Sequence, residues 1–337
     1  MQVLQNVSLK PYNTFGMDVA AEYFLTLSDE QLLPSITADA SLPQQRKILG
    51  GGSNVLLTQP VTGLLIHNQI KGIELIKEDE DHVWLKVASG EVWHELVMYA
   101  ISNGWAGIEN LALIPGTVGA SPMQNIGAYG VEAKETIESV TFWNWEEATF
   151  VTLNNSECNF GYRDSIFKHE LKDKVFITSV VYKLNKKPNL NTSYGAISQE
   201  LDKMGVRDIT IKAIADAVIA IRSSKLPDPK EIGNAGSFFK NPTIPTGQYA
   251  LLQSKYPTIP SYPVSESMVK VPAGWLIEQC GWKGKREGDT GVHAKQALVL
   301  VNYGNAKGAD VWNLSGEVVK SVKDKFGIEL EREVQVW

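Results

Sequence analysis

Two glycine-rich stretches without a charged side chain constrain this chain more than any other feature. The first, residues 50–54, reads Gly-Gly-Gly-Ser-Asn and stands between the apolar Ile48 and Leu49 and a second apolar run that begins at Val55. The second, residues 115–130, holds four glycines among small and amide side chains. Glycine lets a backbone approach a ligand without a Cβ clash, so backbone N–H groups in both loops can cradle a diphosphate.

Neither loop matches the two common nucleotide-binding fingerprints. No Gly-Lys-Ser/Thr sequence follows the second stretch, so it is not a P-loop. The dinucleotide fingerprint would need a glycine at position 55, where Val55 stands. One such loop is often a plain structural turn, whereas two in order, followed by the segment described next, are much more specific.

A third segment presents a single hydroxyl, Ser237, to close approach. Glycines precede it, Phe238 and Phe239 follow it and exclude water, and Lys240 and Asn241 offer a cation and an amide to phosphate or sugar oxygens. This composition is typical of a site. On local composition alone, a serine in a glycine-rich turn beside two core aromatics is an equally good interpretation.

Composition bounds the class of protein independently. With 337 residues, 43% of them hydrophobic, the chain can bury the cores of two or more domains. The net charge of −6 disfavours nonspecific binding to nucleic acid or an anionic membrane. The N-terminal sequence has no basic flank before an apolar stretch, and no uncharged run approaches the roughly 20 residues of a membrane span. We therefore expect a cytoplasmic protein.

The cysteines and histidines argue against a disulfide framework and a metal site. Cys158 and Cys280 are the only cysteines, they form no C-x-x-C motif, and the five histidines lack metal-ligand spacing. We expect both thiols to be buried and reduced, and no metal to be bound.

The apolar periodicity predicts alternating strands and helices. The clearest strands are predicted at residues 22–27, 82–88, 139–143, 175–181 and 297–301. Helices are predicted after a capping box of Ser28 and Gln31, on a stripe of Val92, Leu96, Val97 and Ala100, at residues 211–221 and 273–280, and on a face of Val311, Leu314, Val318 and Val322 that ends at Gly327.

Seven motifs in order resemble those of the UDP-N-acetylenolpyruvoylglucosamine reductases. They are residues 13–16, 50–54, 113–116 with 124–130, 160–167, 225–229, the Ser237 segment, and Glu333 with Val334. Residues 192–195, around Tyr194, further resemble the branch of this family that carries an extra tyrosine loop.

The resemblance implies an α+β fold. It predicts an FAD-binding fold of the vanillyl-alcohol-oxidase/PCMH type made of two α+β lobes, residues 1–70 and 71–222. A smaller α+β substrate-binding domain follows at residues 223–325. A C-terminal segment, residues 326–337, then carries Glu333 back to the active site.

The resemblance also implies a chemistry. NADPH reduces FAD, and the reduced flavin delivers hydride from N5 to UDP-N-acetylglucosamine enolpyruvate, giving UDP-N-acetylmuramate for peptidoglycan precursor synthesis. Because neither glycine loop contains His or Cys, we expect FAD to be noncovalent. The predicted cofactor residues are Gly50, Gly51, Gly52, Ser53, Asn54, Gly116, Thr117, Ser121, Asn125, Ile126, Gly127 and Arg222. We expect a monomer that binds these small molecules, no nucleic acid and no membrane.

Three residues match the catalytic positions of the family. Arg163 would bind the substrate carboxylate with its fork of donors, Ser237 would protonate the carbon intermediate, and Glu333 would hydrogen-bond the enolate if it is protonated. From the residues alone, two non-catalytic interpretations remain open. Arg163 could form a surface ion pair with Asp164, and Glu333 could be a solvated acid near the C-terminus, where residues tend to fray.

Four residues match the family's contacts with the UDP group: Tyr194, Lys225, Asn241 and Gln296. From the residues alone, Lys225 could instead cap a helix and Tyr194 could be a core aromatic.

Two other function classes stay open on the sequence. Another FAD-linked oxidase or dehydrogenase of this fold would keep the glycine loops, but would not need Arg163, Ser237 and Glu333 together. A nucleotide-sugar-binding module without redox chemistry would need only the UDP contacts. The yellow colour of a flavoprotein separates this last class from the others.

Overall fold

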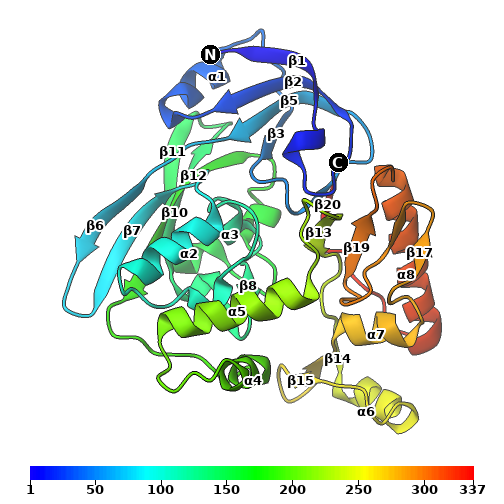
Figure 1. The fold of residues 1–337 in the computed structure, drawn as a ribbon. Coiled ribbons are helices and arrows are strands. Elements are labelled where there is room, and N and C mark those ends of the chain that lie inside the picture. Colours follow the sequence, from blue (N-terminus) through cyan, green and yellow to red (C-terminus); the bar gives the residue numbers. More distant parts are fainter. The chain divides into compact units, whose positions relative to one another are not determined.

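The chain folds into two compact units, each assembled from three segments of the sequence. The computed structural model describes residues 1–337 (Figure 1). The first unit comprises Met1–Val7, Ala21–Gly51 and Thr62–Ser224, and the second comprises Ser8–Ala20, Gly52–Val61 and Lys225–Trp337.

Two short N-terminal segments, Ser8–Ala20 and Gly52–Val61, thus belong to the C-terminal unit. The domain boundaries predicted from the sequence placed both segments in the first FAD-binding lobe. Hydrogen bonds within this unit account for the assignment. Asn234 N–H donates to the Thr14 carbonyl at 3.0 Å, and the Asn302 side chain donates to the Phe15 carbonyl at 2.8 Å.

The first unit begins with a four-stranded sheet. Its order is β1 (Val3–Ser8), β2 (Ala20–Leu27), β5 (Val61–Asn68) and β3 (Arg46–Leu49). Strands β3 and β5 are parallel, with Arg46 opposite Leu64. The strand predicted at residues 22–27 is confirmed as β2, and α1 (Leu33–Ala38) connects it to β3.

The start of this helical segment differs from the prediction. Asp29, rather than Ser28, is the N-cap, because its carboxylate accepts the Gln31 N–H at 2.9 Å. Aspartate caps a helix as well as serine does. One 3-10 turn (Glu30–Leu32) then leads into α1, whose first turn contains Pro34.

A five-stranded antiparallel sheet forms the second lobe of this unit. Its order is β11 (Thr149–Asn154), β10 (Ile137–Asn144), β12 (Val175–Asn185), β7 (His82–Ala88) and β6 (Ile73–Glu78), which confirms three predicted strands. Helices α2 (Trp93–Ser102) and α5 (Ile211–Lys225) contribute Leu96, Val97, Ile214 and Val218 to one core with it. Val92, the first residue of the predicted stripe, is instead the exposed N-cap of α2, and Trp93 is buried at the start of the helix.

The two lobes of the first unit also share a core. Leu25, Leu27 and Ile66 of the first sheet cluster with Trp143 and Phe176 of the second. The shorter elements of this unit are α3 (Ala120–Met123), β8 (Gly127–Ala128), β9 (Val131–Glu132) and α4 (Gly195–Lys203).

The second unit is also α+β. Its sheets are β13 (Gly233–Ser237), β19 (Val299–Asn302), β18 (Thr290–Val292) and β17 (Arg286–Glu287); β14 (Thr243–Pro245), β16 (Met268–Lys270) and β15 (Tyr262–Pro263); and β20 (Gln335–Val336) with β4 (Val55–Leu56). Its helices are α6 (Thr246–Lys255), α7 (Ala273–Gln279) and α8 (Gly308–Phe326).

Helices α5, α7 and α8 confirm their predictions. Helix α8 buries Val311, Leu314, Val318 and Val322 on one face and ends at Gly327, which has a left-handed φ of 65°. Cys158 is buried as expected, but Cys280 is only partly buried, because it caps the short α7. No helix combines the length and the apolar content that crossing a membrane requires.

The two glycine stretches lie against each other in the first unit. A Cβ on Gly50 would stand 2.4 Å from Thr117 Oγ1, and a Cβ on Gly51 would stand 3.1 Å from the Gly116 Cα. No side chain fits at this contact without displacing a neighbour. The glycines at 50 and 51 therefore allow two backbone segments to touch.

We predict that Gly50→Ala lowers the free energy of unfolding by about 1–3 kcal/mol, the range for overpacking a dense contact. Gly247→Ala is the control, because the first turn of α6 leaves open space at that position. Adding Thr117→Ala to Gly50→Ala should restore part of the loss, since it removes the clashing Oγ1. Urea unfolding measures all three variants, and equal midpoints for both single variants would contradict the close packing.

Candidate functional site

The second glycine stretch is tied to the start of α2. Trp93 N–H donates to the Gly116 carbonyl at 3.0 Å, and Gly119 N–H donates to the Ser89 carbonyl at 2.8 Å. A Cβ on Gly119 would stand 2.8 Å from that of Ser89. The loop is therefore held in a defined shape, as a preorganised binding loop requires.

Buried polar side chains brace this loop from within. The hydroxyls of Ser121 and Tyr182 share a hydrogen bond of 2.5 Å, and both residues are fully buried. Asn125 is also fully buried and donates to the Gly161 carbonyl at 2.9 Å while accepting the Lys134 N–H at 3.0 Å. The side chains of Ser121 and Asn125 thus hold the loop in place.

Arg163 lies against the same loop. Its guanidinium donates to the carbonyls of Gly127 and, at 3.3 Å, of Asn125. Asp164 pairs with His169 at 2.8 Å, and this bond lowers the pKa of Asp164 although desolvation opposes the shift. The Arg163 side chain therefore contacts the glycine loop, while Asp164 pairs with His169.

A second cation, Arg222, reaches the loop from α5. Its Nε donates to the Leu113 carbonyl at 3.3 Å, and Leu113 N–H donates to His94 Nδ1 at 3.0 Å. Burial lowers the pKa of Arg222, and contact with Tyr129 opposes that shift. Burial also lowers the pKa of His94, and the charge of Arg222 adds to the effect. His94 is thus held neutral, as its role as an acceptor requires.

Strained backbone concentrates around this loop. Leu113, Asn125, Tyr129 and Arg163 are non-glycine residues with φ values of 59°, 43°, 50° and 55°. Such left-handed residues cost about 1–3 kcal/mol each and cluster at functional sites. Four of the eight non-glycine residues with positive φ thus lie around this loop, which supports its interpretation as a site.

Tyr194 stands beside this region and half exposed. Its ring meets that of Tyr129 edge to face, with centroids 5.3 Å apart. The preceding segment is tied to the glycine stretch, because Asn191 donates to the Gly130 carbonyl at 3.3 Å and accepts at its own carbonyl from Asn110 at 2.9 Å. Tyr129 lies within the predicted second glycine stretch, but its contact with Tyr194 was not predicted from the sequence.

Ser237 and Glu333 lie close together along the backbone of the second unit. Ser237 is exposed at the end of β13, after Gly236 with a φ of 67°. Glu333 N–H donates to the Phe238 carbonyl at 2.8 Å, so the segment that carries Glu333 runs beside the Ser237 strand. Phe238 and Phe239 are buried beneath it.

Asn241 and Gln296 both contact the start of α7. Asn241 Oδ1 accepts the Ala273 N–H at 2.9 Å, and Gln296 Oε1 would stand 3.3 Å from a Cβ on Gly274. Gln296 Oε1 also accepts the Leu298 N–H at 3.3 Å. Both side-chain oxygens thus accept a backbone N–H, which leaves the amide nitrogens as donors. Lys225, the last residue of α5, is exposed.

The first glycine loop continues into the second unit at Gly52. A Cβ on Gly52 would stand 2.0 Å from the Tyr12 carbonyl oxygen, and its φ is 61°, so only glycine fits. Thr14 N–H donates to the Gly52 carbonyl at 3.1 Å. Motif residues 13–16 therefore support this loop.

The predicted residues fall into two groups. The first unit brings together Gly50, Gly51, Gly116, Thr117, Ser121, Asn125, Ile126, Gly127, Arg163, Tyr194 and Arg222, and the second contains Gly52, Ser53, Asn54, Lys225, Ser237, Asn241, Gln296 and Glu333. No group of three or more His, Cys, Asp or Glu side chains is arranged to hold a metal ion.

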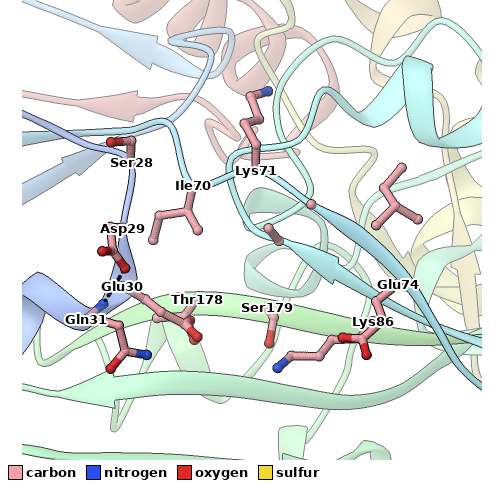
Figure 2. Close-up of a pocket in the computed structure, with 13 residues that line it drawn as sticks. Ser28, Asp29, Glu30, Gln31, Ile70, Lys71, Glu74, Lys86, Thr178 and Ser179 are labelled. Atoms are coloured by element: carbon pink, nitrogen blue, oxygen red, sulfur yellow. Dashed lines mark hydrogen bonds between the residues drawn. The ribbon is translucent and has the colours of Figure 1, made fainter.

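A separate pocket of about 350 Å³ opens between the start of the helical segment at residues 28–31 and strands β6, β7 and β12 (Figure 2). Lys71 and Lys86 line it together with Asp29, Glu30 and Glu74. None of the predicted site residues lines this pocket. Its mixed charges do not select one class of ligand.

The glycine loops fit a diphosphate cofactor. They carry no carboxylate, their backbones are preorganised, and two guanidinium groups stand beside the second loop. Residues 23–154, which include both loops, match the family described as FAD binding domain. Fold and site therefore define an FAD-binding α+β protein.

The comparisons identify the family. Residues 228–337 match the family UDP-N-acetylenolpyruvoylglucosamine reductase, C-terminal domain. The chain is 52% identical over 337 residues to the UDP-N-acetylenolpyruvoylglucosamine reductase of Flavobacterium johnsoniae, with 100% of both chains covered. It is 50% identical over 335 residues to that of Chromobacterium violaceum, covering 99% of this chain and 98% of the relative. The chain belongs to the UDP-N-acetylenolpyruvoylglucosamine reductase family.

A solved structure agrees with this assignment. The UDP-N-acetylenolpyruvylglucosamine reductase (MurB) from Thermus caldophilus superimposes with a TM-score of 0.70 at 26% identity, covering 100% of this chain and 99% of that one. The α+β, FAD-binding fold expected from the sequence is thereby confirmed.

Proposed function

We propose that this protein uses NADPH to reduce UDP-N-acetylglucosamine enolpyruvate to UDP-N-acetylmuramate, a step of peptidoglycan precursor synthesis. Membership of the reductase family over its full length supports the reaction class. The observation that carries the assignment of residues is the Glu333–Phe238 backbone bond, because it holds the segment that carries Glu333 beside the segment that carries Ser237.

FAD, when bound, accepts hydride from NADPH and supplies hydride to the methylene carbon of the enolpyruvyl group. Residues 50–54 and 115–130 would hold its diphosphate through backbone N–H groups, and Arg222 would add a positive charge. The buried Ser121 and Asn125 side chains keep the second loop in shape for this contact.

Arg163 binds the carboxylate of the enolpyruvyl group. Its bonds to the carbonyls of Asn125 and Gly127 fix the plane of the guanidinium, which suits recognition of both carboxylate oxygens. This charge stabilises the negative charge that develops beside it in the transition state.

Ser237 Oγ–H protonates the carbon next to the carboxylate. A hydroxyl is a weak acid, but a developing carbanion is basic enough to take its proton. Phe238 and Phe239, which follow Ser237, are buried and anchor this segment in the core of the second unit. Glu333 hydrogen-bonds the enolate oxygen when its carboxyl group is protonated.

Tyr194, Lys225, Asn241 and Gln296 bind the UDP group. The amide nitrogens of Asn241 and Gln296 donate to diphosphate or sugar oxygens, because their oxygens already accept backbone N–H groups. Lys225 supplies a cation at the end of α5. We further propose that the protein acts as a monomer in the cytoplasm, where nucleotide sugars and NADPH are available.

Anaerobic stopped-flow spectroscopy tests this function. The purified protein should be yellow, NADPH should bleach the flavin absorbance, and UDP-N-acetylglucosamine enolpyruvate should restore it. Acid precipitation should release the flavin. A colourless protein that takes up no FAD, or a reduced protein that the substrate does not reoxidise, would sink the proposal.

We predict that Ser237→Ala separates the two half-reactions. Flavin reduction by NADPH should keep its rate, while reoxidation by the enolpyruvyl substrate should slow by at least about 10²-fold, the lower range for loss of a general acid. Ser237→Cys should recover part of the loss, since a thiol is more acidic than a hydroxyl. Reoxidation of Ser237→Ala at the wild-type rate would show that the proton comes from elsewhere.

We predict that Tyr194→Phe weakens the productive binding of the UDP substrate by removing one hydroxyl donor. The loss should be about 3- to 10-fold in kcat/KM, as expected for one hydrogen bond of roughly 1 kcal/mol. The edge-to-face contact with Tyr129 remains in this variant, so the loop keeps its position. Steady-state kinetics with unchanged kcat and KM would exclude the hydroxyl contact.

A further inference from the structure

The C-terminal segment around Glu333 is hydrogen-bonded to two different elements of the second unit. On its N-terminal side it runs beside the Ser237 strand, where Lys240 N–H donates to the Glu331 carbonyl at 2.9 Å and Glu333 N–H donates to the Phe238 carbonyl at 2.8 Å. Lys240 and Glu331 also form an ion pair. These bonds fix Glu333 from one direction.

On its C-terminal side the same segment pairs with β4. Gln335 N–H donates to the Asn54 carbonyl at 3.1 Å, and Trp337 N–H donates to the Leu56 carbonyl at 3.0 Å. The two strands are parallel, with Gln335 opposite Val55. We call residues 334–337 the C-terminal strap.

Thr58 fastens the far end of the C-terminal strap. Its backbone N–H and its Oγ1 both donate to the Trp337 carbonyl, at 2.7 and 2.8 Å. The Trp337 carbonyl thus accepts two hydrogen bonds from one residue. The side chain of Thr58 therefore acts on the strap through one hydrogen bond that a substitution can remove without touching the backbone bond.

Glu333 lies where the two sets of bonds meet. Asn54, the last residue of the first glycine loop, donates from Nδ2 to the Glu333 carbonyl at 3.4 Å and accepts Gln335 N–H at its own carbonyl. Glu333 is thus flanked by a bond to the Ser237 strand and by bonds to the loop. Any slip of the strap along β4 would displace Glu333 from both.

We propose that Thr58 is a positioning residue for Glu333, acting through the C-terminal strap. This inference rests on the proposed function, in which Glu333 hydrogen-bonds the enolate during the second half-reaction. The strap contributes backbone bonds and the buried Val334, and no ionisable side chain of its own. Its two routes to the site are Glu333 and Asn54 of the first glycine loop, and the proposal assigns the effect on reoxidation to Glu333.

If Thr58 had a purely structural role, its loss would change the rates of the two half-reactions in a different way. If the strap only stabilised the second unit, loss of the Thr58 hydroxyl would slow both half-reactions or neither. It would also add to the effect of removing the Glu333 carboxyl group, because independent effects add. If Thr58 positions Glu333, loss of the Thr58 hydroxyl should slow reoxidation only while the Glu333 carboxyl group is present.

The experiment is a double-mutant cycle of Thr58→Val and Glu333→Gln in the flavin-loaded full chain. Thr58→Ser keeps the hydroxyl and is the conservative control. Thr152→Val is the matched control, because it removes a hydroxyl that bonds Thr141 at 2.9 Å on the surface of the first unit. Stopped-flow absorbance measures flavin reduction by NADPH and reoxidation by UDP-N-acetylglucosamine enolpyruvate in each variant.

We expect Thr58→Val to leave flavin reduction unchanged and to slow reoxidation by about 3- to 10-fold, the effect of one hydrogen bond on placement. Thr58→Ser and Thr152→Val should react like wild type. In the Glu333→Gln background, Thr58→Val should have no further effect. A chain that ends at Val334 should show a larger loss, up to about 10²-fold, since misplacement of a reacting group is that costly.

Additive effects of Thr58→Val and Glu333→Gln, or equal slowing of both half-reactions, would overturn the positioning role while leaving the proposed function intact. Should Thr58→Val unfold, the chain ending at Val334 provides the same cycle with Glu333→Gln. A wild-type protein that the substrate fails to reoxidise would instead refute the proposed function itself.

Discussion

The direct contact of two glycine backbones is the constraint on which the first unit depends. Gly50 and Gly51 meet Gly116 and Thr117 at distances that leave no room for a Cβ. This contact joins the end of β3 in the first lobe to the loop that precedes α3 in the second. Ser121, Asn125 and Arg163 then hold the second loop from its other side, through bonds to the rest of the second lobe.

Elements with a long apolar period could be predicted from the sequence. Helix α8 repeats its buried residues over about five turns and ends at a glycine, so both its buried face and its C-terminus could be predicted. Strands β7 and β12 were equally clear. The cap at Asp29 was missed because the adjacent Ser28 satisfies the same rule, and local propensity does not distinguish two good caps in succession.

Pairing between distant short segments could not be predicted in the same way. Strands β4 and β20 have only two residues each, too few for any periodicity, yet their parallel pairing fixes the segment around Glu333. For the site, the motifs predict which residues would carry chemistry, whereas the supporting residues His94 and Thr58 emerged only from contacts. Such residues act through neighbours, and composition does not reveal a neighbour far along the chain.

The interleaving of the two units has a consequence for biosynthesis. Residues 8–20 and 52–61 leave the ribosome early, but their partners in the second unit lie beyond residue 225. During translation Val55 and Leu56 of β4 therefore lack their strand partner until Gln335 and Val336 have been synthesised. The first unit can close its own sheets sooner. Nascent chains should thus pass through a stage in which the first unit is folded and the second still exposes unpaired strand edges. Such edges are prone to aggregation, and chaperones would bind at this stage.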